Sequence, residues 1–206
     1  MFQAIQNYLE LQGNKYVSPA KAGDLAPLME DYRRQGQEAR QEFTALAQAF
    51  QALHPEWELH RSSQWMNQAQ RLRPHFWAYL QREGKKSEPM LALRLYGDRK
   101  NFGVSLEVSF LERMKDEESL AKQAKVLERE ISAPLYYLAQ GKNCNQVLGP
   151  APKLRQQLLA GLEKGDIRKV LVKGNVDLTQ ASQMTVILEQ LEEIYQLLEP
   201  IYLATR

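Results

Sequence analysis

Residues 75–110 read HFWAYLQREGKKSEPMLALRLYGDRKNFGVSLEVSF and decide the fold of this chain. They hold three runs, 75–81, 90–96 and 104–110, in which side-chain character alternates with the period of two that is typical of a β-strand. Each run has one face made of aliphatic residues or Phe, and we expect that face to point into the core. The connectors contain Gly84 and Gly97, as short loops between antiparallel neighbours do. The pattern predicts a three-stranded antiparallel meander.

Helical patterns flank the meander. Over residues 2–53 apolar side chains recur at spacings of three, four or seven, which predicts helices. Asp24 is the predicted N-cap of a long helix, Gly36 a weak point inside it, and His54 the point where it stops before a proline. The remaining patterns predict, in chain order, a helix over 62–70, a helix from Asp116 to about Glu128, a strand over 135–138, a loop over 141–152, a helix over 153–162, a strand over 169–172 and a helix over 182–198.

These elements predict an α+β fold, in which an antiparallel sheet of four or five strands has helices packed mainly on one face. The chain has 206 residues, of which 44% are hydrophobic and 25% charged, as expected for one globular domain. Its parts would be helical (1–70), sheet-rich (75–140) and mixed α/β (151–206). A single cysteine and the lack of a long apolar run or signal peptide predict a cytoplasmic protein with no membrane association.

The charge of the chain is uneven. The net charge of +2 divides into −3 over residues 1–60, +6 over residues 61–101 and −1 over the rest. A local basic excess attracts phosphate or other anions, although a basic surface with no ligand has the same composition. The face of the meander opposite the aliphatic one gathers a mixed set of side chains: His75, Trp77, Tyr79, Arg94, Tyr96 and Glu107.

This mixed face allows two interpretations. In the first it is the floor of a ligand pocket, where aromatic planes stack on a ring, Arg94 holds an anion, and His75 or Glu107 exchanges a proton. In the second it is a smaller core covered by the N-terminal helices, with a cross-strand ion pair between Arg94 and Glu107. Arg99 and Lys100, in the glycine-containing loop over 97–103, are further candidates for phosphate contacts, although no known phosphate-loop pattern is present.

Several kinds of site are disfavoured. Asp98 and Glu107 have roughly the spacing of the acidic pair in a magnesium-dependent nuclease motif, but Ser109 stands where that motif needs a lysine. No histidine or cysteine has the spacing of a metal ligand set, and no cofactor pattern occurs, so we expect neither a metal nor a cofactor. Cys144 has no neighbouring histidine to activate it.

The leading hypothesis is therefore a binding domain whose aromatic and basic face takes a nucleotide or a nucleic-acid segment. A different hypothesis is an enzyme acting on a small anionic substrate, with Arg94 as the anchor and His75 or Glu107 as acid or base. A third is an interaction protein that forms a homodimer through its terminal helices. The three hypotheses place the working surface on different elements.

A resemblance accompanies these patterns. The segment Arg73-Pro74-His75-Phe76 runs into an aromatic strand, and Leu95-Tyr96-Gly97-Asp98 and Ile167-Arg168-Lys169-Val170 follow later. This arrangement resembles a bacterial family of about this length, and the order of elements is similar to that of the YktB-like proteins, which carry Pro-His-Phe before a strand. The resemblance implies a layout that covers most of the chain, and it assigns no catalytic residue.

Overall fold

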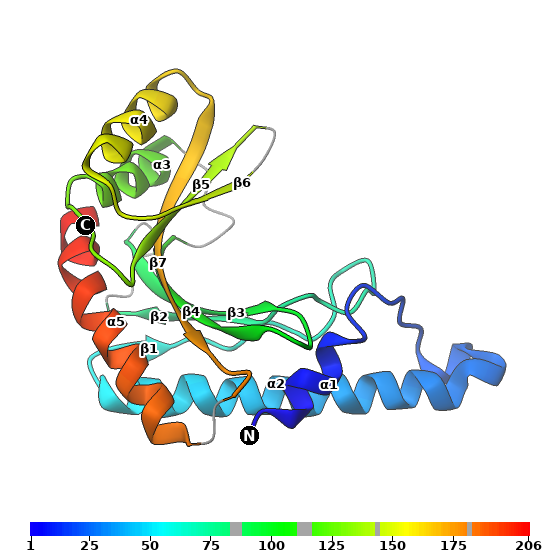
Figure 1. Ribbon diagram of the computed structural model, residues 1–206. Coiled ribbons are helices and arrows are strands. Elements are labelled where there is room, and N and C mark those ends of the chain that lie inside the picture. Colours follow the sequence, from blue (N-terminus) through cyan, green and yellow to red (C-terminus); the bar gives the residue numbers. More distant parts are fainter. Residues whose placement is uncertain (83–87, 111–116, 143–144, 181–182) are drawn as a thin grey trace.

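The computed structural model describes residues 1–82, 88–110, 117–142, 145–180 and 183–206 (Figure 1). Asp116, Gly84 and Cys144, which the sequence patterns single out, lie outside these residues. The α-helices are α1 (Gln3–Leu9), α2 (Ala26–Leu53), α3 (Glu117–Ala124), α4 (Pro152–Glu163) and α5 (Met184–Thr205), with short 3-10 helices η1 (Pro19–Lys21), η2 (Gly23–Leu25) and η3 (Lys125–Leu127). The strands are β1 (Glu58–Leu59), β2 (Trp77–Gln81), β3 (Met90–Gly97), β4 (Phe102–Ser109), β5 (Tyr136–Gly141), β6 (Asn145–Leu148) and β7 (Ile167–Asp177).

A seven-stranded sheet of order β1-β2-β3-β4-β7-β5-β6 forms the centre of the fold, and every neighbouring pair is antiparallel. The predicted meander is confirmed, because β2, β3 and β4 are successive neighbours. Strand β7 pairs with β4 on one side and with β5 on the other, so it joins the two halves of the sheet. Figure 1 shows the sheet bending along β7, with β5 and β6 turned away from the plane of β3 and β4.

The prediction of an α+β fold with an antiparallel sheet is confirmed, but the predicted four or five strands are fewer than the seven in the structure. The two missed strands are β1, with two residues, and β6, with four. Most of their side chains are exposed, so they carry no alternation of apolar and polar residues. Strand β6 lies inside the predicted loop over 141–152, where Gly141, Gly149, Pro150 and Pro152 suggested irregular structure.

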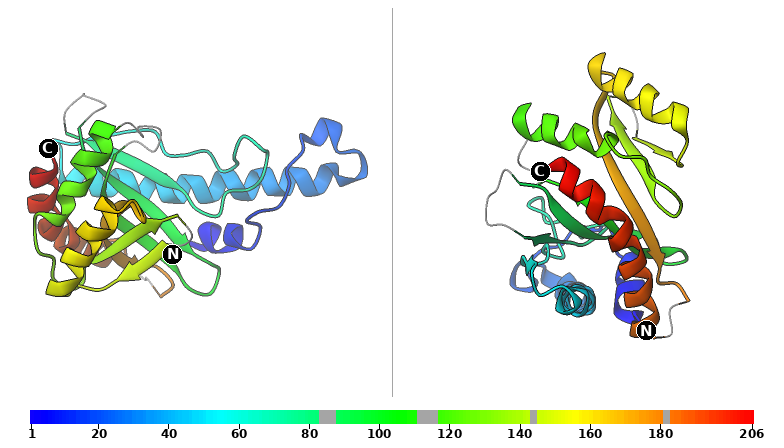
Figure 2. Two further views of the ribbon diagram at one scale, coloured as in Figure 1. Left: turned by 90° about the horizontal axis from the view of Figure 1, so that it is seen from above. Right: turned by 90° about the vertical axis from the view of Figure 1, so that its left-hand side faces the viewer.

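The core lies on the aliphatic face of the meander. Helices α1, α2 and α5 pack against this face, α2 running along the length of the sheet and α5 crossing it (Figures 1 and 2). Gly174 on β7 permits a close approach of α5, because a Cβ atom there would lie 2.6 Å from a side-chain carbon of Ile194. The apolar stripe of α5 is buried in this core: Ile187, Leu191, Ile194, Tyr195, Leu198, Ile201 and Tyr202.

Two helix predictions were wrong. Residues 62–70 form no helix; their backbone instead makes an isolated bridge between Met66 and Leu72. Trp65 is buried edge-on against Tyr16, with ring centres 4.9 Å apart, and this tertiary packing overrides the local helical pattern. Asp24 lies in the 3-10 helix η2, and α2 begins at Ala26 without a side-chain cap. Helix α2 ends at Leu53, just before His54, as predicted.

Gly36 is a packing position and not a weak point, because α2 continues through it and the ring of Trp65 lies against it. A Cβ atom at Gly36 would lie 2.7, 2.8 and 3.0 Å from three atoms of that ring. We expect Gly36→Ala to lower the free energy of unfolding by about 1–3 kcal/mol through overpacking, although alanine favours a helix by about 1 kcal/mol. Urea denaturation measures the change, with the exposed neighbour Gln37→Ala as the control. Stabilisation by Gly36→Ala would show that Trp65 moves freely.

Within the described residues, no helix combines the length and the apolar composition needed to cross a membrane.

Candidate functional site

The face of the sheet opposite the helical core carries polar and aromatic side chains in register. Directly opposite residues in an antiparallel pair share a face. One row across the strands is Trp77, Arg94, Ser105 and Asn175; the next is Tyr79, Ala92, Glu107, Lys173 and Tyr136; a third is Tyr96, Gly103 and Asp177. We call these twelve residues the polar sheet face. It lies on the inner side of the bend along β7, because α1 and α2 cover the outer side of β3 and β4 (Figure 1).

Glu107 is the centre of this face and is fully buried. Its Oε1 lies 3.3 Å from Nε of Arg94, and its Oε2 lies 2.7 Å from Nζ of Lys173, whose side chain is only 8% exposed. Burial acts to raise the pKa of Glu107, but the nearby charges of Lys173, Arg94 and Lys169 outweigh burial and lower it below 4.5. The carboxylate is therefore ionised at neutral pH and holds two cations in fixed positions on the sheet.

Two arginine side chains and a histidine lie around Trp77 at the edge of the same face. The guanidinium carbon of Arg73 lies 4.6 Å from the centre of the Trp77 ring, and that of Arg94 lies 5.4 Å from it. The ring of His75 is 5.9 Å away, centre to centre. Both arginines are within cation–π range of one indole, and this contact orders their long side chains. The Arg73 side chain is also held by the backbone, since its Nε donates a hydrogen bond to the Met66 carbonyl at 3.2 Å.

Two tyrosines extend the face towards β7 and β5. Tyr96 lies over Gly103, where a Cβ atom would come within 2.5 Å of the tyrosine oxygen. Burial, together with the carboxylate of Asp177, raises the pKa of Tyr96. The hydroxyl of Tyr136 donates to Oδ1 of Asn175 at 2.8 Å, and burial raises its pKa to about 12. Both phenols are therefore neutral at physiological pH, and both rings are only partly covered.

The structure brings most of the predicted site residues together. Arg94 contacts both Trp77 and Glu107, so the predicted cross-strand pair between Arg94 and Glu107 is present. Tyr79 is buried with Met90 and Ala92 in a small cluster beside Trp77. The expected covering by the N-terminal helices is wrong, because those helices pack on the aliphatic face, which carries Leu91, Leu93 and Leu95. Tertiary packing chose the purely apolar face for the helices because it buries more hydrocarbon.

Arg99 and Lys100 do not join this site. They lie at the tip of the hairpin between β3 and β4, where Arg99 forms an ion pair with Glu10 just after α1. The backbone N–H of Lys100 donates to the carboxylate of Asp98 at 2.8 Å, so Asp98 orders the turn. Asp98 is therefore separated from Glu107 along β4 and does not form an acidic pair with it.

The sequence patterns missed Lys173, Asn175 and Asp177, because the predicted strand stopped at residue 172 whereas β7 extends to Asp177. A signal was present: polar residues occupy every second position from 173 to 177. Gly174 hid it, since glycine usually weakens a strand. Arg73 was also overlooked, because it precedes β2 and belongs to no regular element.

Among the described residues, no group of three or more His, Cys, Asp or Glu side chains is placed to hold a metal ion. No protein-family model matches the chain, and a search of curated proteins found no similar protein. The resemblance to the YktB-like proteins therefore stays an expectation, and the function rests on the chemistry of the polar sheet face.

Proposed function

We propose that the polar sheet face binds a phosphate-containing ligand, with a single-stranded nucleic-acid segment as the preferred form and a nucleotide as its minimal unit. The observation that carries this proposal is the convergence of Arg73 and Arg94 on Trp77. Stacked guanidinium groups are pre-ordered, so they lose little conformational freedom when they contact a phosphate. Single strands are recognised by such pairing of backbone phosphates with cations and of bases with aromatic rings.

The charge of the face supports an anionic ligand. Among the described side chains on or beside it, Arg73, Arg94, Lys169 and Lys173 outnumber the two carboxylates, Glu107 and Asp177. Glu107 neutralises part of this charge, and its two ion pairs fix the positions of Lys173 and Arg94 on the strands. The partly exposed rings of Tyr96 and Tyr136 lie on the same face and offer surfaces for bases. Phosphates would therefore lie towards β2, and bases towards β7.

Acid–base catalysis through Glu107 is less well supported. A general base works best when its pKa is close to the working pH. The two cations beside Glu107 lower its pKa, and its carboxylate is fully buried between them. Glu107 is thus better suited to orienting cations than to accepting a proton from a substrate.

The test is fluorescence anisotropy of labelled single-stranded and duplex oligonucleotides, with ATP as a competitor, at low and moderate salt. We expect the single strand to bind more tightly than the duplex, and log affinity to fall linearly with log salt concentration. Arg73→Glu should weaken binding by about tenfold or more, because it replaces a phosphate contact by a repulsion. Arg73 forms no ion pair with a described carboxylate, so the change leaves Glu107 and its partners in place.

Lys100→Glu is the matched control. It makes the same change of charge on an exposed residue at the hairpin tip, outside the polar sheet face, and we expect it to leave the affinity within about twofold. Absence of binding at low salt, or an equal loss in the two variants, would contradict the proposal. The single cysteine supports our further proposal of a cytoplasmic location, a reducing compartment in which nucleic acid is present.

A further inference from the structure

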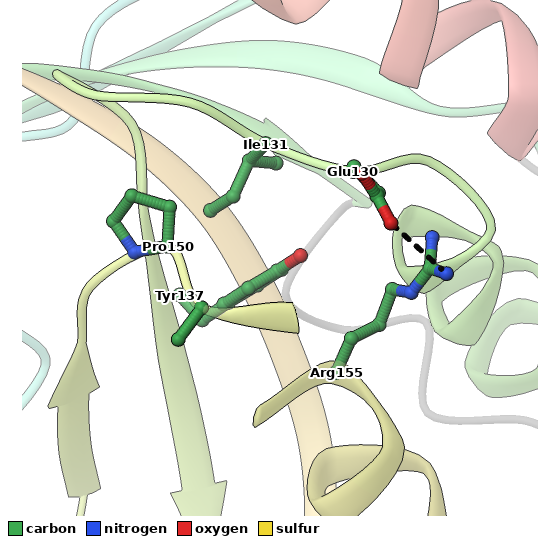
Figure 3. Close-up of a pocket in the computed structure, with 6 residues that line it drawn as sticks. Glu130, Ile131, Tyr137, Pro150 and Arg155 are labelled. Carbon is green, nitrogen blue, oxygen red and sulfur yellow. Dashed lines mark ion pairs between the residues drawn. The ribbon is translucent and has the colours of Figure 1, made fainter. Parts of the chain in front are cut away.

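A second candidate site lies on the other side of the sheet, under α4. A cavity of about 90 Å³ is lined by Glu130, Ile131, Tyr137, Pro150, Ala151 and Arg155 (Figure 3). Tyr137 reaches it from β5 and Arg155 from the first turns of α4, while Glu130 and Ile131 belong to the segment before β5. Tyr137 follows Tyr136 in the strand, so its side chain points away from the polar sheet face. The two candidate sites are therefore separate.

Tyr137 is the unusual feature of this cavity. Its side chain is almost entirely enclosed, the residue being 2% exposed, and its hydroxyl lies close enough to Arg155 and Glu130 for their charges to act on it. Figure 3 shows the phenol oxygen pointing towards the space beside Glu130 and Arg155. Burial raises the pKa of Tyr137, so the hydroxyl keeps its proton and can donate. The hydroxyl therefore faces the cavity as a donor that an acceptor inside the cavity can reach.

Arg155 supplies the charge that such an acceptor needs. Its guanidinium nitrogen lies 3.5 Å from a carboxylate oxygen of Glu130, a loose pair in which the Glu130 side chain is 73% exposed and that of Arg155 30% exposed. A ligand can replace so exposed a carboxylate at little cost. Arg155 also lies near the N-terminal end of the twelve-residue helix α4, where the helix dipole favours negative charge.

We propose that this cavity binds a short aliphatic carboxylate. The planar carboxylate matches the fork of the Arg155 guanidinium and accepts the proton of the Tyr137 hydroxyl. The hydrocarbon tail would contact Ile131, Pro150 and Ala151, which form the apolar part of the wall. The small volume limits the ligand to a few heavy atoms, and Glu130 disfavours a dianion such as phosphate through like-charge repulsion.

The probe is sodium propionate, titrated against the full chain while amide shifts are followed in ¹H–¹⁵N spectra at constant ionic strength. We expect saturable shifts in β5 and at the start of α4. Arg155→Gln should weaken propionate at least about tenfold, because it removes a charge-assisted pair of hydrogen bonds. Glu130→Gln should strengthen propionate binding severalfold, because it removes the internal competitor for Arg155. Arg34→Gln, which removes an exposed arginine paired with Asp31 and Glu38 on α2, should change nothing.

Tyr137→Phe separates a binding role from a structural one. If the hydroxyl serves the ligand and not the fold, the variant should keep or raise the melting temperature while it weakens propionate binding. A clear fall in melting temperature would mean that the hydroxyl is bonded within the protein, and would overturn the inference. So would unchanged propionate binding in Arg155→Gln, or binding of inorganic phosphate as tight as that of propionate. Each of these outcomes is independent of nucleic-acid binding by the polar sheet face.

Discussion

Replacing Glu107 by Gln is expected to destabilise the protein by about 3–5 kcal/mol, the range measured when one partner of a buried ion pair is removed. The carboxylate is fully buried, and Lys173 beside it is nearly so. Glutamine fills the same space but leaves the ammonium group of Lys173 buried without a counter-charge. Chemical denaturation measures the loss of stability. The control is Glu38→Gln, which removes an exposed ion pair with Arg34 on α2 and should cost less than about 1 kcal/mol.

The pH dependence of stability provides a second readout for Glu107. Its folded-state pKa is lowered, so its contribution to stability is present above the ordinary value of 4.5 and is lost as the pH falls through the lowered pKa. The difference in unfolding free energy between the wild-type protein and Glu107→Gln should therefore be largest at neutral pH and shrink in acid. A difference that stays constant between neutral and strongly acidic pH would contradict the ionised, paired state of Glu107.

A double-mutant cycle isolates the pair itself. In Glu107→Gln with Lys173→Met the unpaired ammonium is gone, so the combined loss should be smaller than the sum of the single losses by about 1 kcal/mol or more. Strict additivity would mean that the two groups, at 2.7 Å, contribute independently. Because Lys173 lies on the polar sheet face, the double variant also tests whether stability and ligand binding can be separated.

Phe76→Ala is expected to cost about 3–5 kcal/mol, the usual loss when a large core side chain is truncated and leaves a cavity. Phe76 is fully buried and links the sheet to the helices, with its ring centre 5.1 Å from that of Tyr8 on α1 and 5.8 Å from that of Phe43 on α2. Phe76→Leu, which keeps most of the volume, should cost less than half as much. Thermal and urea unfolding measure both changes.

The neighbouring residue gives the contrasting result. Trp77 points to the opposite side of the sheet from Phe76 and is only partly buried. Trp77→Ala should therefore cost less stability than Phe76→Ala but should weaken nucleic-acid binding, because Arg73 and Arg94 lose the ring that orders them. Equal destabilisation by the two changes would mean that both faces of the sheet are core.

Much of the fold was predictable because it depends on local periodicity. The alternation in residues 75–110 correctly separated the aliphatic face from the polar one, and the 3.6-residue pattern correctly located α2, α4 and most of α5. The short strands β1 and β6 were not predictable, because two to four mostly exposed residues carry no periodic signal. The helix predicted over 62–70 is absent because Trp65 packs against Tyr16 and Gly36, which lie far from it in the sequence and so leave no local signal.

The candidate site divides in the same way. Which side chains of β2 and β3 share a face follows from the period of two within each strand, so Trp77 and Arg94 were correctly predicted to lie on one side. The partner of Glu107 depends on strand order: β7 enters the sheet between β4 and β5 and brings Lys173 beside it. Strand order depends on contacts between distant segments, such as the packing of α5 and β7 in a common core, and no local pattern encodes such contacts. The amino-acid sequence alone thus indicates which side chains share a face of each strand. Which charged groups on neighbouring strands become partners is settled only in the folded sheet, because that depends on strand order.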